Sequence, residues 1–103
     1  MNISDIPQKE LLPGIKARFV HTENNTIGFI ELDANALLPE HAHIHEQTTQ
    51  VLEGQLELTI DGVVQVLNPG MLVTIPSNTI HSAKALSFCK VTDVFSPVRE
   101  DYK

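Results

Sequence analysis

The chain has 103 residues, of which 42% are apolar and 19% charged, and this composition excludes a disordered protein. Its net charge of −6 and the lack of a Lys/Arg cluster argue against binding to nucleic acid or to an anionic membrane surface. A single cysteine, Cys89, excludes an intramolecular disulfide, and no apolar run approaches the roughly 20 residues of a membrane span. We expect one domain over residues 1–103, located in the cytoplasm because the N-terminus lacks a signal-peptide pattern.

Short apolar runs recur about every 8–12 residues between turn signals, a pattern typical of an all-β sandwich or barrel. Residues 1–14 are expected to form a loosely ordered arm. The predicted strands cover residues 27–32, 48–52, 56–60, 63–67, 71–75 and about 86–95. The Asp61-Gly62 pair predicts a tight hairpin between the third and fourth of these strands. Asn68-Pro69-Gly70 and Pro76-Ser77-Asn78 predict further turns.

Histidines gather in one short stretch between the first two predicted strands, which reads His41-Ala-His43-Ile-His45-Glu46-Gln47. Neutral imidazole is the commonest protein ligand of transition metals. If this stretch is extended, His41 and His43 point to the same side, about 6.6 Å apart along the strand. His81 comes from a different strand, which a closed sheet can bring opposite the first. The sequence therefore predicts a metal site inside a barrel.

A second signal lies in the last predicted strand, where one face carries Cys89, Val91, Asp93 and Phe95. We expect this face to point inward, which would bury the Asp93 carboxyl group in an apolar interior. Such a group needs a partner or has a raised pKa, which is a signature of functional sites. Arg99 follows six residues later and could pair with Asp93 or hold a substrate carboxylate with its planar guanidinium. Cys89 itself is expected to be an inert packed thiol.

These motifs resemble those of the cupin superfamily. The first motif runs His41-x-His43-x-x-x-Gln47 to Gly54, and the second runs Gly70 to Pro76-x-Asn78-x-x-His81. Asn78 stands where the family usually has glycine, and asparagine is the next-best residue for a positive φ angle. The resemblance implies an all-β fold, the cupin double-stranded β-helix or jelly-roll barrel, with six to eight strands. It implies four metal ligands, His41, His43, Gln47 and His81. A different register, with His43, His45 and Gln50 as ligands, also fits a longer-gap version of the motif.

The segment Asp93-x-Phe95-x-x-x-Arg99 is similar to one subgroup, the small cupins that linearise unsaturated uronates in pectin and alginate breakdown. The resemblance implies that Asp93 is the general acid/base, Arg99 the carboxylate anchor and Phe95 a pocket wall. It implies one divalent transition metal ion (Zn, Ni, Mn, Fe or Co), which the neutral amide of Gln47 would leave with its full charge. The expected partners are a small anionic sugar acid and a second copy of the chain in a homodimer.

The expected reaction is ring opening of a 4,5-unsaturated uronate. Two alternatives stay open: an Fe(II) cupin dioxygenase, and a sugar-binding cupin without catalytic activity. The role of His45 is also open at this point.

Overall fold

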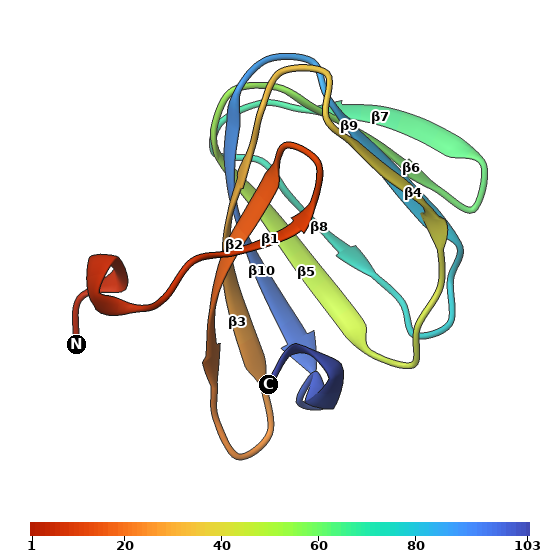
Figure 1. Ribbon diagram of the computed structural model, residues 1–103. Coiled ribbons are helices and arrows are strands. Elements are labelled where there is room, and N and C mark those ends of the chain that lie inside the picture. Colours follow the sequence, from red (N-terminus) through yellow and green to blue (C-terminus); the bar gives the residue numbers. More distant parts are fainter.

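A computed structural model describes all residues, 1–103, and contains two antiparallel sheets and two single-turn 3-10 helices (Figure 1). The elements are η1 (Ile3–Asp5), β1 (Lys9–Leu12), β2 (Ile15–His21), β3 (Thr26–Leu32), β4 (Leu37–His41), β5 (Glu46–Glu53), β6 (Leu56–Ile60), β7 (Val63–Leu67), β8 (Leu72–Ile75), β9 (His81–Ala85), β10 (Cys89–Ser96) and η2 (Glu100–Tyr102). No helix has the length and apolarity needed to span a membrane.

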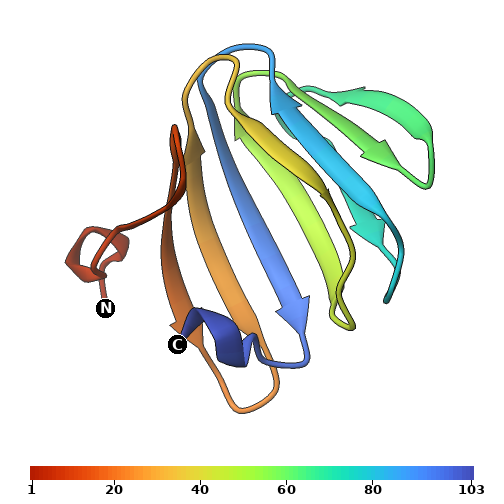
Figure 2. The same ribbon diagram turned by 45° about the vertical axis from the view of Figure 1, so that its right-hand side comes forward.

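The two sheets face each other and enclose the core, as expected for a cupin jelly roll (Figure 2). The six-stranded sheet has the order β1-β2-β3-β10-β5-β8, and the four-stranded sheet has the order β4-β9-β6-β7. Leu56 and Leu58 from the smaller sheet meet Val51 and Val91 from the larger one inside this core. The all-β barrel fold predicted from the sequence is confirmed.

Strand β10 lies in the centre of the larger sheet, between β3 and β5. Its side chains alternate strictly between buried and more exposed positions, and Asp93 and Phe95 are on the buried face. Asp93 lies opposite Thr49 of β5, and Phe95 lies opposite Gln47 of the same strand. The prediction that this face of the strand points inward is therefore confirmed.

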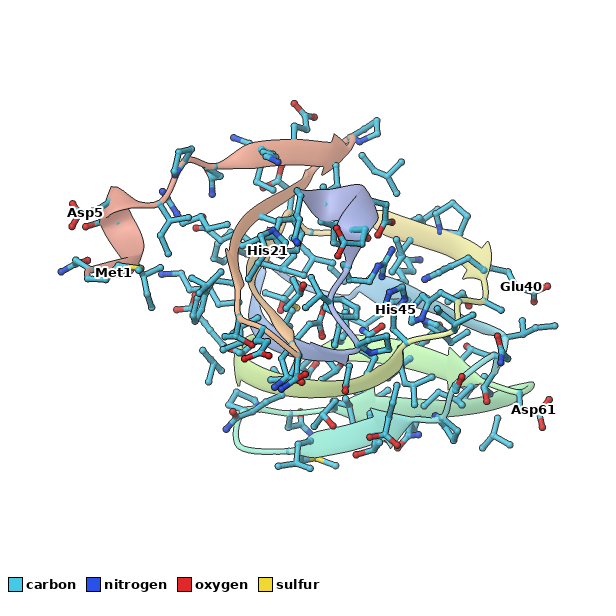
Figure 3. All side chains as sticks on the ribbon, turned by 90° about the horizontal axis from the view of Figure 1, so that it is seen from below. Met1, Asp5, His21, Glu40, His45 and Asp61 are labelled. Atoms are coloured by element: carbon cyan, nitrogen blue, oxygen red, sulfur yellow. The ribbon has the colours of Figure 1, made fainter.

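The predicted strand at about 86–95 is wrong at its start, because the chain changes sheets there. Residues 81–85 form β9 in the smaller sheet, and Cys89 begins β10 in the larger sheet after a short turn. The strand number is also larger than the predicted six to eight, since β1 and β2 form a hairpin that extends the larger sheet. The expected arm at residues 1–14 thus contains a strand, and Figure 3 shows Met1 and Asp5 standing away from the barrel.

Positive φ angles occur at several turns of the barrel. Asn78 has φ 60°, as predicted from its place in the second motif, and Asn35 has φ 70°. At the β6–β7 hairpin both Asp61 and Gly62 have positive φ, which is the requirement of a type I′ turn. Gly54 has φ 81°, and a Cβ atom there would lie 2.0 Å from the Phe88 carbonyl oxygen, so only glycine fits this crossing.

Candidate metal centre

Three histidines come together at one end of the barrel. His41 ends β4 and His81 begins β9, and the two residues are paired across these neighbouring strands. His43 lies beyond the end of β4, so the loop, and not strand alternation, brings it to the other two. The ligand nitrogen atoms of the three side chains all lie within 4.8 Å of one another. This geometry can hold one metal ion.

Backbone carbonyl groups orient all three rings in the same way. In each ring Nδ1 is hydrogen-bonded to a carbonyl oxygen, which can only accept, so Nδ1 carries the hydrogen atom and Nε2 presents its lone pair. The acceptors are Pro39 for His41 (2.7 Å), His45 for His43 (2.9 Å) and Thr79 for His81 (2.8 Å). The Nε2 atom of His81 is buried and has no hydrogen-bond partner. An orphaned lone pair beside two similar ones fits a divalent cation with nitrogen ligands.

Gln47 adds an oxygen atom to this group. It lies buried on β5, where its amide nitrogen donates to the Thr49 hydroxyl at 3.0 Å. That hydroxyl donates in turn to Asp93 at 2.6 Å, so Thr49 must accept from Gln47 and the amide orientation follows. The Gln47 oxygen then lies 3.2 Å from His43 Nε2. The Gln47 oxygen therefore lies beside the histidine cluster.

The contact between Gln47 and His43 itself favours the binding of a cation at this place. Burial lowers the pKa of His43, and the charges of Arg99 and His81 lower it further. The ring is therefore neutral, with its hydrogen on Nδ1, so two lone pairs face each other across 3.2 Å. This arrangement is repulsive unless a positive ion lies against both atoms.

Asp93 lies on the inner side of this network. It is 6% exposed, and burial raises the pKa of its carboxyl group from 3.8 to about 6, against the hydrogen bonds from Thr49 and Gln47 and the charge of Arg99. A carboxyl group with this pKa exists in both protonation states near neutral pH, which is suitable for general acid/base chemistry.

Arg99 follows β10, after the cis Ser96–Pro97 bond, and only 7% of it is exposed. Its Nε and Nη2 atoms donate to the two carboxylate oxygens of Asp101, at 3.0 and 2.7 Å. The guanidinium carbon lies 4.9 Å from the ring centre of Phe95 and 4.0 Å from that of Tyr102. The expected carboxylate anchor therefore stands at the site, but it already has an acidic partner.

A cavity of about 70 Å³, large enough for several water molecules, connects these groups. Its polar lining comes from both sheets and from the C-terminal turn, and includes His41, Gln47, Thr49, His81, Asp93 and Arg99. Phe95 and Tyr102 also line it, and most of the other lining residues are apolar, among them Leu56 and Leu58. All seven predicted site residues thus lie in the histidine cluster or along this cavity.

Thr49, Asp101 and Tyr102 were not identified from the sequence. Thr49 could have been, since it lies two residues from Gln47 on one strand and therefore shares its face. The residues of the C-terminal turn show no periodic pattern that would place them beside the barrel opening.

The alternative register is wrong, because Gln50 is exposed. It lies on the outer face of β5 and therefore points away from the histidines. His45 lies at the bend before β5, at the end of the barrel seen in Figure 3, and its buried Nδ1 has no partner. His21 bonds to Thr26 at 2.9 Å and takes no part in the cluster. Burial raises the pKa of the Cys89 thiol, as expected for an inert packed cysteine.

Comparison with known proteins agrees with the fold described above. Residues 28–95 match the Cupin_2 family, described as a cupin domain. The chain is 29% identical over 101 residues to the pectin degradation protein KdgF of Dickeya dadantii, covering 95% of this chain and 92% of that protein. It is 34% identical over 87 residues to quercetin 2,3-dioxygenase of Bacillus subtilis, covering 78% of this chain but only 26% of that protein.

Solved structures agree with this result. The structure of KdgF from Halomonas sp. superimposes with a TM-score of 0.92 at 30% identity, over 97% of this chain and 94% of that one. An RmlC-like cupin from Shewanella frigidimarina superimposes with a TM-score of 0.95 at 28% identity, over 100% of this chain and 94% of that one.

Proposed function

The chain belongs to the Cupin_2 family of cupin domains, and from that premise we propose that it is a metal-dependent enzyme that opens the ring of a 4,5-unsaturated uronate. The observation that carries the proposal is the convergence of three groups on one cavity: the histidine cluster, the buried acid Asp93 and the cation of Arg99. The similarity to a relative named a pectin degradation protein supports the choice of substrate, because pectin consists largely of uronate units.

The reaction needs two proton movements and no oxidant. In the cyclic substrate the bond between C1 and the ring oxygen breaks, and the C1 hydroxyl loses its proton to become an aldehyde. The enolate left at C5 becomes a ketone as C4 gains a proton, so the product is an isomer, the linear 4-deoxy-5-keto sugar acid. One group that both accepts and donates protons can serve both steps.

Asp93 is suited to that role. Its carboxyl group, with a pKa of about 6, takes up a proton from one substrate atom and releases it to another near neutral pH. Its hydrogen bond from Thr49 fixes the orientation of the carboxyl group, which lines the cavity. Arg99 binds the substrate carboxylate through the N–H groups that Asp101 does not use, and Phe95 forms a wall beside it.

His41, His43 and His81 would hold the metal with the amide oxygen of Gln47 as fourth ligand. A bound divalent cation would act as a Lewis acid toward an oxygen atom of the substrate. The neutral ligand set leaves the charge of such an ion uncompensated, which favours an anionic ligand in the cavity.

The test follows the double bond of an unsaturated galacturonate by its ultraviolet absorbance. Removal of the acid in Asp93→Ala is expected to lower kcat at least about 100-fold, the usual contribution of a general acid/base. The metal content of that variant should equal that of the parent, whereas the exposed Asp61→Ala should change neither quantity. If Asp93→Ala turns over the uronate as fast as the parent, the proposed catalytic role is wrong.

A second candidate function is an Fe(II) dioxygenase. The mainly apolar lining of the cavity favours it, as does the 34% identity to quercetin 2,3-dioxygenase over part of that protein. Oxygen uptake by the iron-loaded protein, measured with aromatic substrates and with uronates, separates the two functions. A ring-opening isomerase consumes no oxygen.

A further inference from the structure

The guanidinium group of Arg99 is held from two directions by residues of the C-terminal turn. Asp101 accepts from Nε and Nη2, so two of the five N–H groups are used and the edge formed by Nη1 and the remaining Nη2 hydrogen stays free. Arg99 lines the cavity, while the Asp101 side chain is 58% exposed on the outer side. The ion pair thus fixes which edge of the guanidinium remains available.

Tyr102 restrains the same group from its flat face. The guanidinium carbon lies 4.0 Å from the centre of the tyrosine ring, a cation–π contact. On its other side this ring stacks on Phe19 of β2, with ring centres 4.5 Å apart. The backbone oxygen of Tyr102 accepts from the Lys9 ammonium at 3.2 Å, which ties the turn to β1. The end of the chain is therefore anchored to the first hairpin.

A long arginine side chain without such restraints would have several rotamers, and most of them would not direct an N–H edge into the cavity. The Arg99 charge is also nearly buried, so without Asp101 it would lack a compensating partner and would turn toward solvent. The contacts with Asp101 and Tyr102 thus both fix the orientation of the free edge of the guanidinium group.

We propose that Asp101 and Tyr102 are positioning residues, which hold the free edge of Arg99 toward the cavity so that it selects a carboxylate ligand. The inference rests on the proposed function in taking a uronate as the ligand. The 3-10 turn η2, which contains Asp101 and Tyr102, would then discriminate between a sugar acid and a neutral sugar.

Binding is measured by calorimetry on the full metal-loaded chain, with galacturonate and with the neutral sugar galactose as probes. The parent is expected to prefer galacturonate, and Asp101→Asn should reduce this preference about tenfold. The matched control is Glu100→Gln, because Glu100 lies in the same turn but pairs only with Lys103 on the surface. It should keep the preference of the parent.

Two variants of Tyr102 distinguish the contribution of its ring from that of its hydroxyl group. Tyr102→Phe retains the contact with the guanidinium and should keep the preference, whereas Tyr102→Ala should lose it about as far as Asp101→Asn does. An unchanged or increased preference in Asp101→Asn would overturn the inference, since Asp101 would then be irrelevant or would compete with the ligand. A parent protein without any preference for galacturonate would overturn it as well.

Turnover of the unsaturated uronate distinguishes this inference from the proposed function. In Asp101→Asn the KM should rise about tenfold while kcat stays within about twofold, because Asp93 and the histidines are unchanged. If the parent opens no uronate ring but loses its galacturonate preference in Asp101→Asn, the proposed function fails and the positioning role stands. If turnover occurs and KM does not respond to Asp101→Asn, the positioning role fails alone.

Discussion

Replacement of Asp93 by asparagine should stabilise the metal-free protein at alkaline pH. The carboxyl group is buried, and burial raises its pKa in the folded protein from 3.8 to about 6. A raised pKa means that the folded state binds the proton more tightly than the unfolded state does. The stabilising contribution of the protonated acid is therefore complete below pH 3.8 and is lost as the pH rises through 6.

The size of the effect follows from the shift. A difference of about two pKa units corresponds to about 3 kcal/mol in the free energy of unfolding, since one unit corresponds to about 1.4 kcal/mol. Asparagine has nearly the same shape, stays neutral at every pH and can still accept the Thr49 hydrogen bond. Above pH 7 Asp93→Asn should thus be more stable by up to about 3 kcal/mol, or roughly 12–24 °C in Tm.

The assay is urea denaturation of chelator-treated protein at several pH values between 5 and 8.5. The difference in unfolding free energy between Asp93→Asn and the parent should grow from pH 5 to about pH 7 and stay constant above it, because the carboxyl group is then ionised in both the folded and the unfolded parent. Asp61→Asn is the matched control, because Asp61 is exposed in a hairpin turn and its replacement should shift the curve without changing its pH dependence. Parallel curves for Asp93→Asn and the parent would refute the burial argument.

Three further changes test other parts of the site and the fold. His81→Ala should lower the bound metal from one ion per chain to near zero by elemental analysis, whereas His21→Ala should retain it, because only His81 belongs to the cluster; equal metal loss in both would contradict the assignment. Thr49→Val removes the hydroxyl between the ligand amide and the buried acid, so it should cost about 1–3 kcal/mol of stability and weaken metal affinity at least about tenfold in a titration; unchanged affinity would show that the amide needs no such support. Gly54→Ala should destabilise the protein by roughly 3 kcal/mol or more, because the new Cβ would meet a carbonyl oxygen at 2.0 Å, while Gly62→Ala has a similar φ, meets nothing within 4 Å and should lose only about 1 kcal/mol; equal losses in thermal denaturation would mean that backbone strain alone decides.

The central strands could be predicted from the sequence because each has one buried face. In β10 strict alternation placed Asp93 and Phe95 inside, and this parity was enough to predict a buried carboxyl group. The edge region was harder to predict. In β4 the pattern is interrupted by Pro39 and Glu40, and the pairing with β9 shifts register between Leu38 and His41. Alternation therefore carries no clear signal there.

The same irregularity explains why the histidines lie together for a different reason from the one that their spacing suggested. His41 and His43 were expected to share a strand face, but His43 lies in the loop, and its ring is turned toward the cluster by the hydrogen bond to the His45 carbonyl. Loop geometry depends on such single contacts. The contribution of Tyr102 is of the same kind, since it depends on a turn that packs against Phe19, more than 80 positions earlier in the sequence.

The arrangement of hydrogen bonds separates this site from an ordinary buried polar cluster. In a cluster that serves only stability, nearly every buried polar group has a hydrogen-bond partner, because an unpaired buried group is costly. Here the carbonyl-bound rings leave the Nε2 of His81 without a donor, and they direct that of His43 against the oxygen of Gln47. Asp93 is buried beside them at a further cost. Three unfavourable placements within one cavity, in a barrel whose other core positions are mainly apolar, are more economically explained by an ion and an anionic ligand than by folding alone.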